Sequence, residues 1–215
     1  MTQVSPRSTA EPAERRRSAF LRSPVLLWCA FVATHLVLGL LNSYGGGYPL
    51  GDMSVYKFWV DQAVMSDFWV GIDAPWVYPI LAIVPMFIAR LAYPVAATIP
   101  AFATSTLDVG LYSASWLSLV LVLDLVAFGV LTGWGRRPDR VAVGWWWVLF
   151  LLMLGPIAVG RIDSVTVPIA VIGVVLVATR PVVATVVFTV AAWIKVWPGA
   201  LVIALLRVSR TRSPI

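Results

Sequence analysis

A polar stretch at residues 42–76 carries four of the ten acidic residues in an otherwise strongly apolar chain. The first of them, Asp52, follows the glycine-rich segment 45–51. Its carboxylate could accept a proton as a general base, or it could cap a helix that begins at Met53, because aspartate is a favoured N-cap residue. The two roles are compatible, and the spacing does not choose between them.

The residues after Asp52 have the pattern of an amphipathic helix. Val55, Phe58, Trp59 and Ala63 fall near one face of such a helix. A helix with an apolar face and a polar face can lie in the surface of a membrane. We therefore predict a surface helix directly after Asp52, with Asp61 as one of its solvated residues.

Four charged residues further along the chain could face this stretch. Arg161 and Asp163 lie in a short turn between apolar runs, where an ion pair or an aspartate cap would explain them structurally. Arginine there could also bind a lipid-linked phosphate, because guanidinium groups match phosphate oxygens. Lys195 interrupts an apolar run, which is costly in a membrane and typical of functional sites. Arg90 is a third candidate cation.

The composition places these residues in a membrane protein. The chain of 215 residues is 60% hydrophobic and 12% charged, with a mean hydropathy of +0.89, whereas soluble domains are about 25% charged. The net charge of +6 comes from basic residues at the ends of apolar runs, as in cytoplasmic loops, and not from a nucleic-acid-binding surface. We predict an all-α polytopic membrane protein that binds no nucleic acid.

The apolar runs predict the positions of the helices, since a spanning helix needs about 20 mainly apolar residues. Full spans are expected at about residues 24–41, 112–132, 141–159 and 164–179. A helical hairpin or a broken span is expected at 182–206, where Lys195 and Pro198-Gly199 interrupt the apolar run. A hairpin would bring Lys195 to the same side as Arg161.

The segment 77–98 is apolar but contains Pro79, Pro85 and Pro94. Prolines at this density interrupt the hydrogen bonds of a helix. We expect this segment to be broken, re-entrant or surface-lying, which membranes tolerate when other parts of the protein cover it.

The basic residues predict which side of the membrane each segment faces. Arginines cluster before the first span, at residues 136–140, at Arg180 and after the last apolar run, so these segments are assigned to the cytoplasm. The expected domains are a disordered basic cytoplasmic tail at 1–23, a transmembrane domain at 24–207 with an outer loop at 42–76, and a basic cytoplasmic tail at 208–215. A cleaved signal peptide is the alternative for the N-terminus, but no small-residue cleavage site follows it.

Two ionisable residues lie in the middle of predicted spans. Asp124 is expected to face the interior of the bundle, where charged side chains mark functional or pairing sites. Its partner is not apparent from the sequence. His35 could face the same interior or a helix that this chain lacks, and helix packing is favoured over catalysis. The single histidine and the single cysteine, Cys29, provide no zinc site and no disulfide framework.

Several short motifs follow one another in a recognisable order. Gly51-Asp52 and Tyr56 come after the first span, and Tyr78-Pro79 opens the proline-containing segment. Residues 160–163 are similar to a Gly-Gln-x-Asn helix start, and Ile194-Lys195-x-x-Pro198 is similar to a Leu-Lys-Pro-x-Pro stretch. Over about residues 25–212, this order resembles the polytopic GT-C glycosyltransferases, most closely the actinobacterial polyprenyl-phosphomannose-dependent mannosyltransferases.

The resemblance implies transfer of a mannosyl or related residue from a polyprenyl phosphate to a lipid or glycan acceptor at the outer face of the plasma membrane. Asp52 would deprotonate the acceptor hydroxyl, with inversion at the anomeric carbon. The residues implied in binding the substrate and the lipid-linked phosphate are Tyr56, Arg90, Arg161, Asp163 and Lys195. No nucleotide would be needed, which agrees with the absence of Asp-x-Asp and of a glycine-rich phosphate loop. Participation of a divalent cation is left open.

Two departures from the family pattern keep other hypotheses open. Arg161 and Asp163 stand where the family has glutamine and asparagine. Family members also continue with further spans, so this chain could be a half-length, split or inactive member that needs a second membrane subunit. A non-catalytic, transporter-like protein is the other hypothesis, because transporters also place charges beside broken helices. The large acidic outer loop and the lack of an inverted repeat argue against a transporter.

Overall fold

The structure is a computed structural model that describes residues 22–44, 51–97 and 108–211. These residues form helices, and the described ranges contain no strand beyond an isolated bridge between Val70 and Ala74. The predicted all-α class is therefore confirmed. The elements are α2 (Pro24–Tyr44), α3 (Met53–Ser66), η1 (Ile80–Ala82), α4 (Ile83–Ala97), α5 (Asp108–Thr132), η4 (Pro138–Arg140), α6 (Val141–Leu154), α7 (Ile157–Gly160), α8 (Asp163–Leu176), α9 (Pro181–Ile194) and α10 (Gly199–Thr211).

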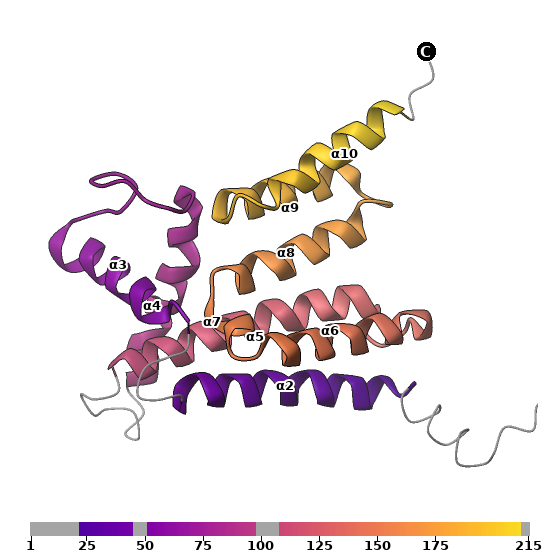
Figure 1. Ribbon diagram of the computed structural model, residues 1–215, viewed down its shortest axis with the longest axis horizontal. Coiled ribbons are helices and arrows are strands. Elements are labelled where there is room, and N and C mark those ends of the chain that lie inside the picture. The colour runs from indigo at the N-terminus through magenta and orange to yellow at the C-terminus, as the bar shows by residue number, and fades with distance from the viewer. Residues whose placement is uncertain (1–21, 45–50, 98–107, 212–215) are drawn as a thin grey trace, which may run out of the picture.

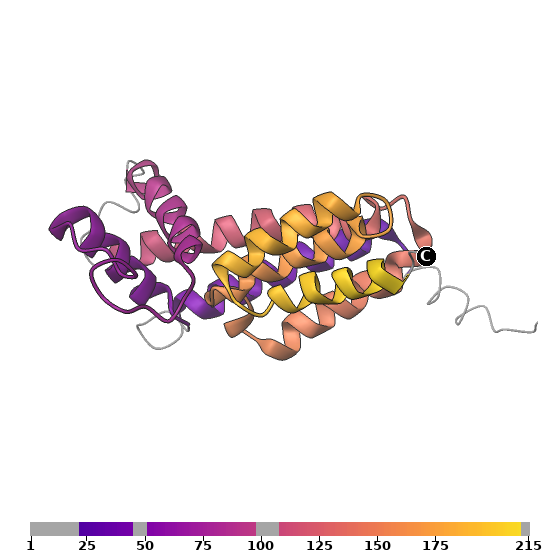
Figure 2. The same cartoon turned by 90° about the horizontal axis from the view of Figure 1, so that it is seen from above.

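Most of the helices run along the long axis of the molecule. Helices α2, α5 and α6 lie against one another, and α8 packs on α5, followed by α9 and α10 (Figures 1 and 2). Within the described residues, two segments, Pro24–Ser43 and Gly110–Thr132, are long and apolar enough to cross a membrane. Helices α8 and α9 are apolar but shorter, with 14 residues each.

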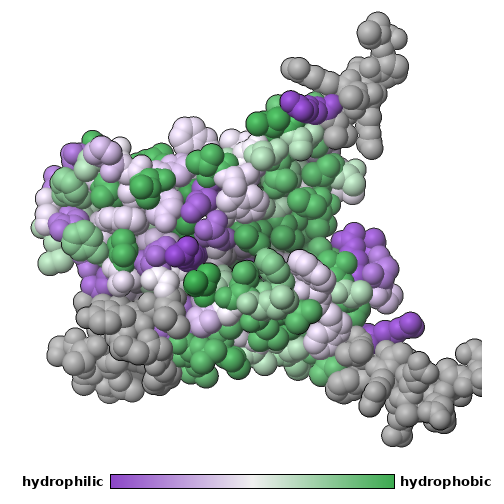
Figure 3. All heavy atoms as spheres, viewed as in Figure 1, coloured by the Kyte–Doolittle hydropathy of each residue, from purple (hydrophilic) through white to green (hydrophobic). Residues whose placement is uncertain are grey.

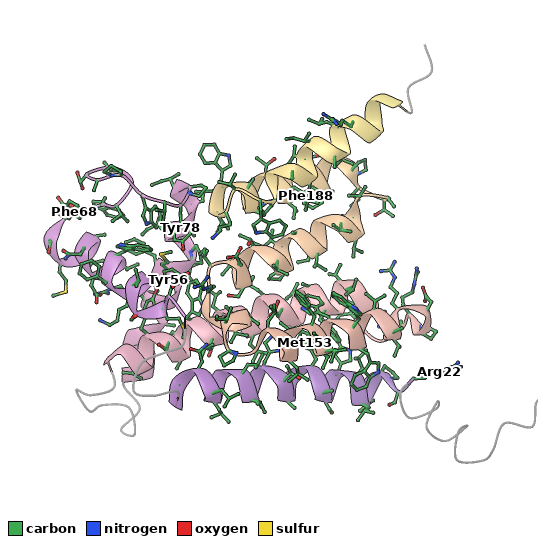
Figure 4. All side chains as sticks on the ribbon, viewed as in Figure 1. Arg22, Tyr56, Phe68, Tyr78, Met153 and Phe188 are labelled. Atoms are coloured by element: carbon green, nitrogen blue, oxygen red, sulfur yellow. The ribbon has the colours of Figure 1, made fainter. Side chains whose placement is uncertain are left out.

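Aromatic residues and glycines allow the helices to pack closely. Phe31 of α2 stacks on Phe128 of α5 with ring centroids 3.9 Å apart, and Trp147 of α6 meets both rings. A Cβ on Gly144 of α6 would lie 2.7 Å from Cδ2 of Leu27 in α2, so a larger residue there would make the Leu27 side chain shift. Gly173 similarly receives the ring of Phe188 between α8 and α9 (Figure 4).

The proline-containing segment is more regular than we predicted. Pro79 precedes η1, and α4 then continues from Ile83 to Ala97. Pro85 lies in the first turn of α4, where backbone N–H groups have no partner within the helix, so its missing N–H costs little. The expected break is therefore absent between Ile83 and Ala97, whereas the re-entrant and surface-lying alternatives stay predictions. Figure 1 shows α4 running across the direction of the long helices rather than along it.

Helix α3 forms where the amphipathic pattern predicted it. Met53, Tyr56, Val60 and Ala63 are buried, because α3 packs on α4 and α5. Of the residues on the predicted apolar face, Val55 is 42% exposed and Phe58 is 57% exposed. The placement of this face in a membrane surface stays a prediction.

Several predicted boundaries differ from the observed ones. Helix α6 ends at Leu154 instead of Val159, because Gly155, with φ of 66°, and Pro156 end the helix before the short α7. Helices α9 and α10 form the predicted hairpin around residues 195–198. Helix α10 continues to Thr211, into the segment that we assigned as a tail from residue 208. Residues 1–21 and 212–215 of the predicted tails lie outside the described residues.

The two ends of the bundle differ in charge. One end, here called the basic end, has seven arginines in the described ranges: Arg22, Arg136, Arg137, Arg140, Arg180, Arg207 and Arg210. The other, here called the α3 end, consists of α3, residues 155–163 and the turn at 195–198. Arg22 marks the basic end in Figure 4, and Figure 3 shows hydrophobic surface on the helices between the two ends. The segments that we assigned to opposite sides of a membrane therefore lie at opposite ends of the helices.

Candidate functional site

The candidate site is at the α3 end, where three segments that are distant in sequence meet. The backbone N–H of Asp52 donates a hydrogen bond to the carbonyl of Gly160 at 3.1 Å. Gly51 has φ of +133°, and a Cβ at this position would lie 2.6 Å from the same carbonyl oxygen. Only glycine fits this contact, because it has no side chain and accepts the positive φ. The contact places Asp52 beside the start of α8.

Asp52 occupies the N-cap position of α3, but its side chain makes no capping hydrogen bond. Its backbone angles, φ −99° and ψ 10°, differ from the extended conformation of a typical cap. The carboxylate instead accepts a hydrogen bond from the Tyr56 hydroxyl at 3.3 Å and lies 3.7 Å from Nε of Arg161. The side-chain cap, one of our two alternatives, is thus wrong. One third of the Asp52 side chain remains exposed and can reach a ligand.

Tyr56 holds the Asp52 carboxylate in place from the buried side of α3. Its side chain is fully buried, and its hydroxyl accepts a hydrogen bond from the backbone N–H of Ile162 at 2.8 Å while it donates to Asp52. Burial raises the pKa of the Tyr56 phenol, and the charge of Asp52 adds to this effect. The hydroxyl therefore keeps its proton. We had expected Tyr56 to bind substrate, but its placement is that of a residue that positions Asp52.

Arg161 and Asp163 point to different partners. Arg161 has an extended backbone, φ −118° and ψ 160°, and the Ile162 side chain between them is buried. Arg161, which is half exposed, pairs with Asp52. Asp163 lies 3.4 Å from Nζ of Lys195. The expected ion pair between Arg161 and Asp163 is therefore replaced by two pairs with residues that are distant in sequence.

The hairpin turn places Lys195 in the site. Its ammonium group lies 4.8 Å from the centre of the Tyr78 ring, a favourable cation–π distance, as well as near Asp163. Trp197 from the same turn donates its indole N–H to Asp163 at 3.1 Å. Sequence reasoning did not identify Trp197, because an aromatic residue at the edge of an apolar run is not unusual in a membrane protein.

Trp59 and Trp76 pack against Tyr78, the ring that faces Lys195, and the three form an aromatic cluster. The three rings meet edge to face, with centroids 5.4 to 5.9 Å apart. Such contacts are favourable because the edge of one ring is positive and the face of the next is negative. Tyr56 and Tyr78 lie in this region, between α3 and the α9–α10 hairpin (Figure 4). The site is thus built on a rigid aromatic base.

Arg90, the third predicted cation, is not in the site. Its Nε lies 2.9 Å from Asp61, and the same carboxylate pairs with Lys57. Asp61 is nine residues after Asp52 on α3, which corresponds to about 13 Å along a helix. Our assignment of Arg90 to the phosphate site is not supported by this placement, because α4 carries it to the far part of α3.

His35 and Asp124 are partners of each other. Nε2 of His35 lies 2.8 Å from Oδ2 of Asp124, and Nδ1 lies 2.9 Å from the carbonyl of Phe31. Both side chains are buried between α2 and α5. The expectation that Asp124 faces the bundle interior is confirmed, and the pair belongs to the helix packing and not to the site at the α3 end.

The site combines two carboxylates with two cations, so its formal charge is zero. Both ion pairs are longer than a hydrogen bond, at 3.7 and 3.4 Å, and every member is between 31% and 51% exposed. Exposed pairs of this kind contribute little to stability, typically about 0–1 kcal/mol. Their charged groups can therefore change partners when a ligand binds.

No group of three or more His, Cys, Asp or Glu side chains in the described ranges is arranged to hold a metal ion. Asp52 and Asp163 each pair with a basic side chain instead. The divalent cation that the sequence left open has no matching ligand set among the described residues.

Comparison with protein-family models, with curated proteins and with solved structures found no match for this chain. The resemblance to GT-C mannosyltransferases stays a prediction from the sequence motifs.

Proposed function

We propose that this protein is a multi-pass plasma-membrane glycosyltransferase with its N-terminus in the cytoplasm. It would transfer a mannosyl or related residue from a polyprenyl phosphate to a lipid or glycan acceptor at the outer face. Two observations support the membrane arrangement: the two segments long enough to span a bilayer and the arginines at one end of the bundle. By the positive-inside rule, the basic end is cytoplasmic, so the α3 end faces outward.

The observation that carries the proposal is the Asp52 carboxylate. It starts a helix without capping it, is held by a buried tyrosine, and stays partly exposed beside Arg161. These are the properties of a positioned general base. Lys195 lies in the same cluster through Asp163, so two cations are available to a phosphate.

In the proposed reaction, Asp52 takes the proton of the acceptor hydroxyl. The acceptor oxygen then forms a bond to the anomeric carbon, and the bond between that carbon and the phosphate oxygen breaks. The electron pair of the broken bond leaves with the polyprenyl phosphate, and the configuration of the sugar is inverted. Arg161 and Lys195 would stabilise the negative charge on the departing phosphate.

The test is sugar transfer from radiolabelled polyprenyl-phosphomannose in membranes that contain the wild type or the Asp52→Asn variant. Loss of a positioned base should lower the rate about 10²- to 10⁴-fold. Asp67→Asn is the matched control, because Asp67 is an exposed residue at the C-terminal end of α3, where its φ of 50° suits asparagine. The control should transfer at the wild-type rate.

Equal transfer by the wild type and Asp52→Asn would remove Asp52 as the base. Absence of transfer from any polyprenyl-phosphate sugar, with either protein, would overturn the enzymatic proposal. That result would favour a non-catalytic or half-length subunit that requires a separately encoded partner.

A further inference from the structure

Trp197 has features that the proposed proton transfer and phosphate binding do not use. It lies in the turn between α9 and α10, is 41% exposed, and donates its indole N–H to Oδ1 of Asp163 at 3.1 Å. Consecutive turn hydrogen bonds hold the backbone around it, from Gly199 to Val196 and from Ala200 to Trp197. The ring is therefore fixed at both the backbone and the indole N–H while part of its surface stays accessible.

The groups beside the ring can both donate and accept hydrogen bonds. Asp163 has about four lone-pair positions, and the structure assigns partners to two of them through Trp197 and Lys195. The Asp163 side chain is 43% exposed, and the Lys195 side chain is 31% exposed. A ligand that meets Trp197 would therefore find an anionic acceptor and a cationic donor at the edge of the indole.

This combination matches the chemistry of a pyranose. A pyranose has a face of C–H groups, which packs on the negative face of an aromatic ring, and an edge of hydroxyl groups, which both donate and accept hydrogen bonds. A phosphate bound by Lys195 would make no use of the indole, and an ionised Asp163 carboxylate has no hydrogen to donate to it. The mixed polar edge therefore favours a neutral sugar over a simple anion.

The position relative to Asp52 also suits a sugar. Arg161, which pairs with Asp52, and Asp163, which holds Trp197, are separated by one residue, Ile162, which is the N-cap of α8. Residues two positions apart have Cα atoms no more than about 7 Å from each other. This is close to the width of one sugar ring. A hexose on Trp197 would thus lie next to the partner of the proposed base.

We propose that Trp197, Asp163 and Lys195 form a hexopyranose subsite, with the ring of the sugar stacked on the indole and its hydroxyls bound by the carboxylate and the ammonium group. This inference rests on the proposed function for the identity of the ligand, because it names where the transferred or accepting sugar is held. Binding of a free sugar, however, does not require transfer, so the two can be tested separately.

The experiment is saturation-transfer difference NMR of the purified full-length protein in detergent, titrated with methyl α-D-mannopyranoside. The wild type should transfer saturation to the sugar ring protons. Trp197→Ala should weaken binding roughly two- to tenfold, the range expected for loss of one aromatic contact. Trp197→Phe should retain most of the binding, because it keeps an aromatic face and loses only the hydrogen bond to Asp163.

Trp193→Ala is the matched control, because Trp193 lies on the same hairpin and is 55% exposed but belongs to α9 outside the site. It should bind like the wild type. Circular dichroism and gel filtration check that each variant is folded, and the Phe variant keeps the test valid if the Ala variant is not. Equal binding by the wild type and Trp197→Ala, equal losses in Trp193→Ala and Trp197→Ala, or no binding by the wild type would each overturn the subsite.

The radiolabel assay separates this inference from the proposed function. A protein that binds the hexoside through Trp197 but transfers no sugar supports the subsite and overturns the transferase. A protein that transfers sugar with the same KM and kcat in Trp197→Ala as in the wild type supports the transferase and overturns the subsite. If both hold, Trp197→Ala should raise KM by a factor similar to its loss of hexoside binding.

Discussion

The carboxylates of this protein are paired in two different ways, in the exposed ion pairs of the site and in the buried contact of Asp124 with His35. Asp52 with Arg161 and Asp163 with Lys195 are 3.7 and 3.4 Å long, and their side chains are a third to a half exposed. His35 and Asp124 are 2.8 Å apart and no more than 5% exposed. Water weakens the first kind and leaves the groups able to exchange partners, whereas burial makes the second kind costly to break.

The hydrogen bonds of His35 define how many protons the buried pair holds. The carbonyl of Phe31 can only accept, so Nδ1 of His35 must carry a proton. A second proton then lies between Nε2 and Asp124, on one group or the other. In both arrangements the pair is neutral overall, which suits a position between two helices that are proposed to cross a membrane.

The largest loss of stability should follow from breaking this buried pair. His35→Ala leaves Asp124 without its partner, and we expect the free energy of unfolding to fall by about 3 kcal/mol. Asp124→Ala should have a similar effect. Thermal unfolding in detergent micelles, followed by circular dichroism, measures both.

The control is the double variant His35→Leu with Asp124→Leu, which removes both polar groups and fills their space. Because no unpaired group is left, it should recover much of the lost stability. Single variants as stable as the wild type would show that the pair does not hold α2 and α5 together. Neither helix contributes a side chain to the site, so the rate of sugar transfer per folded molecule should change little.

An intermediate effect is expected where the site depends on a buried group. Tyr56→Phe removes the hydroxyl that holds Asp52 and leaves the backbone N–H of Ile162 without its acceptor. A buried donor without a partner costs about 1–3 kcal/mol. We expect a stability loss in this range together with slower sugar transfer, measured as kcat at saturating donor.

Tyr112→Phe is the matched control for this variant. Tyr112 is also buried and donates its hydroxyl to the carbonyl of Met86, away from the site. It should lose a comparable amount of stability but retain kcat. If both variants slowed transfer equally, the effect of Tyr56 would be structural and its positioning role would be wrong.

Most of the helices could be predicted from the sequence, because their signals are local. Apolar runs located α2 and α5, and the interruption at Lys195 and Pro198 predicted the α9–α10 hairpin. Other features depend on tertiary contacts. Residue spacing alone did not specify which residues of α3 pack on the protein, and it did not show that Pro85 would lie in the first turn of α4, where it is tolerated.

The members of the site were largely predicted, but their partners were not. Proximity in sequence suggested that Arg161 would pair with Asp163. The backbone instead changes from extended at Arg161 to helical at Ile162, and the two side chains meet Asp52 and Lys195. The contact of Gly51 with Gly160 then decides which acid meets Arg161. The link between Trp197 and Asp163 spans 34 positions, and no local pattern connects them.

The smallest effect on stability, and the sharpest contrast with the buried pair, should come from the exposed cations of the site. Arg161→Gln and Lys195→Gln each remove one long, water-exposed ion pair, so the free energy of unfolding should change by no more than about 1 kcal/mol. Sugar transfer should nevertheless fall, because the charge that stabilises the leaving phosphate is lost.

Arg137→Gln provides the control: Arg137 forms a pair of similar length, 3.5 Å to Asp139, and is also about half exposed, but it lies at the basic end. It should change neither stability nor transfer. A fall in transfer for Arg137→Gln equal to that for Arg161→Gln would show that general charge matters and the site does not, whereas a large loss of stability in Arg161→Gln would show that the exposed pairs are structural like the buried one.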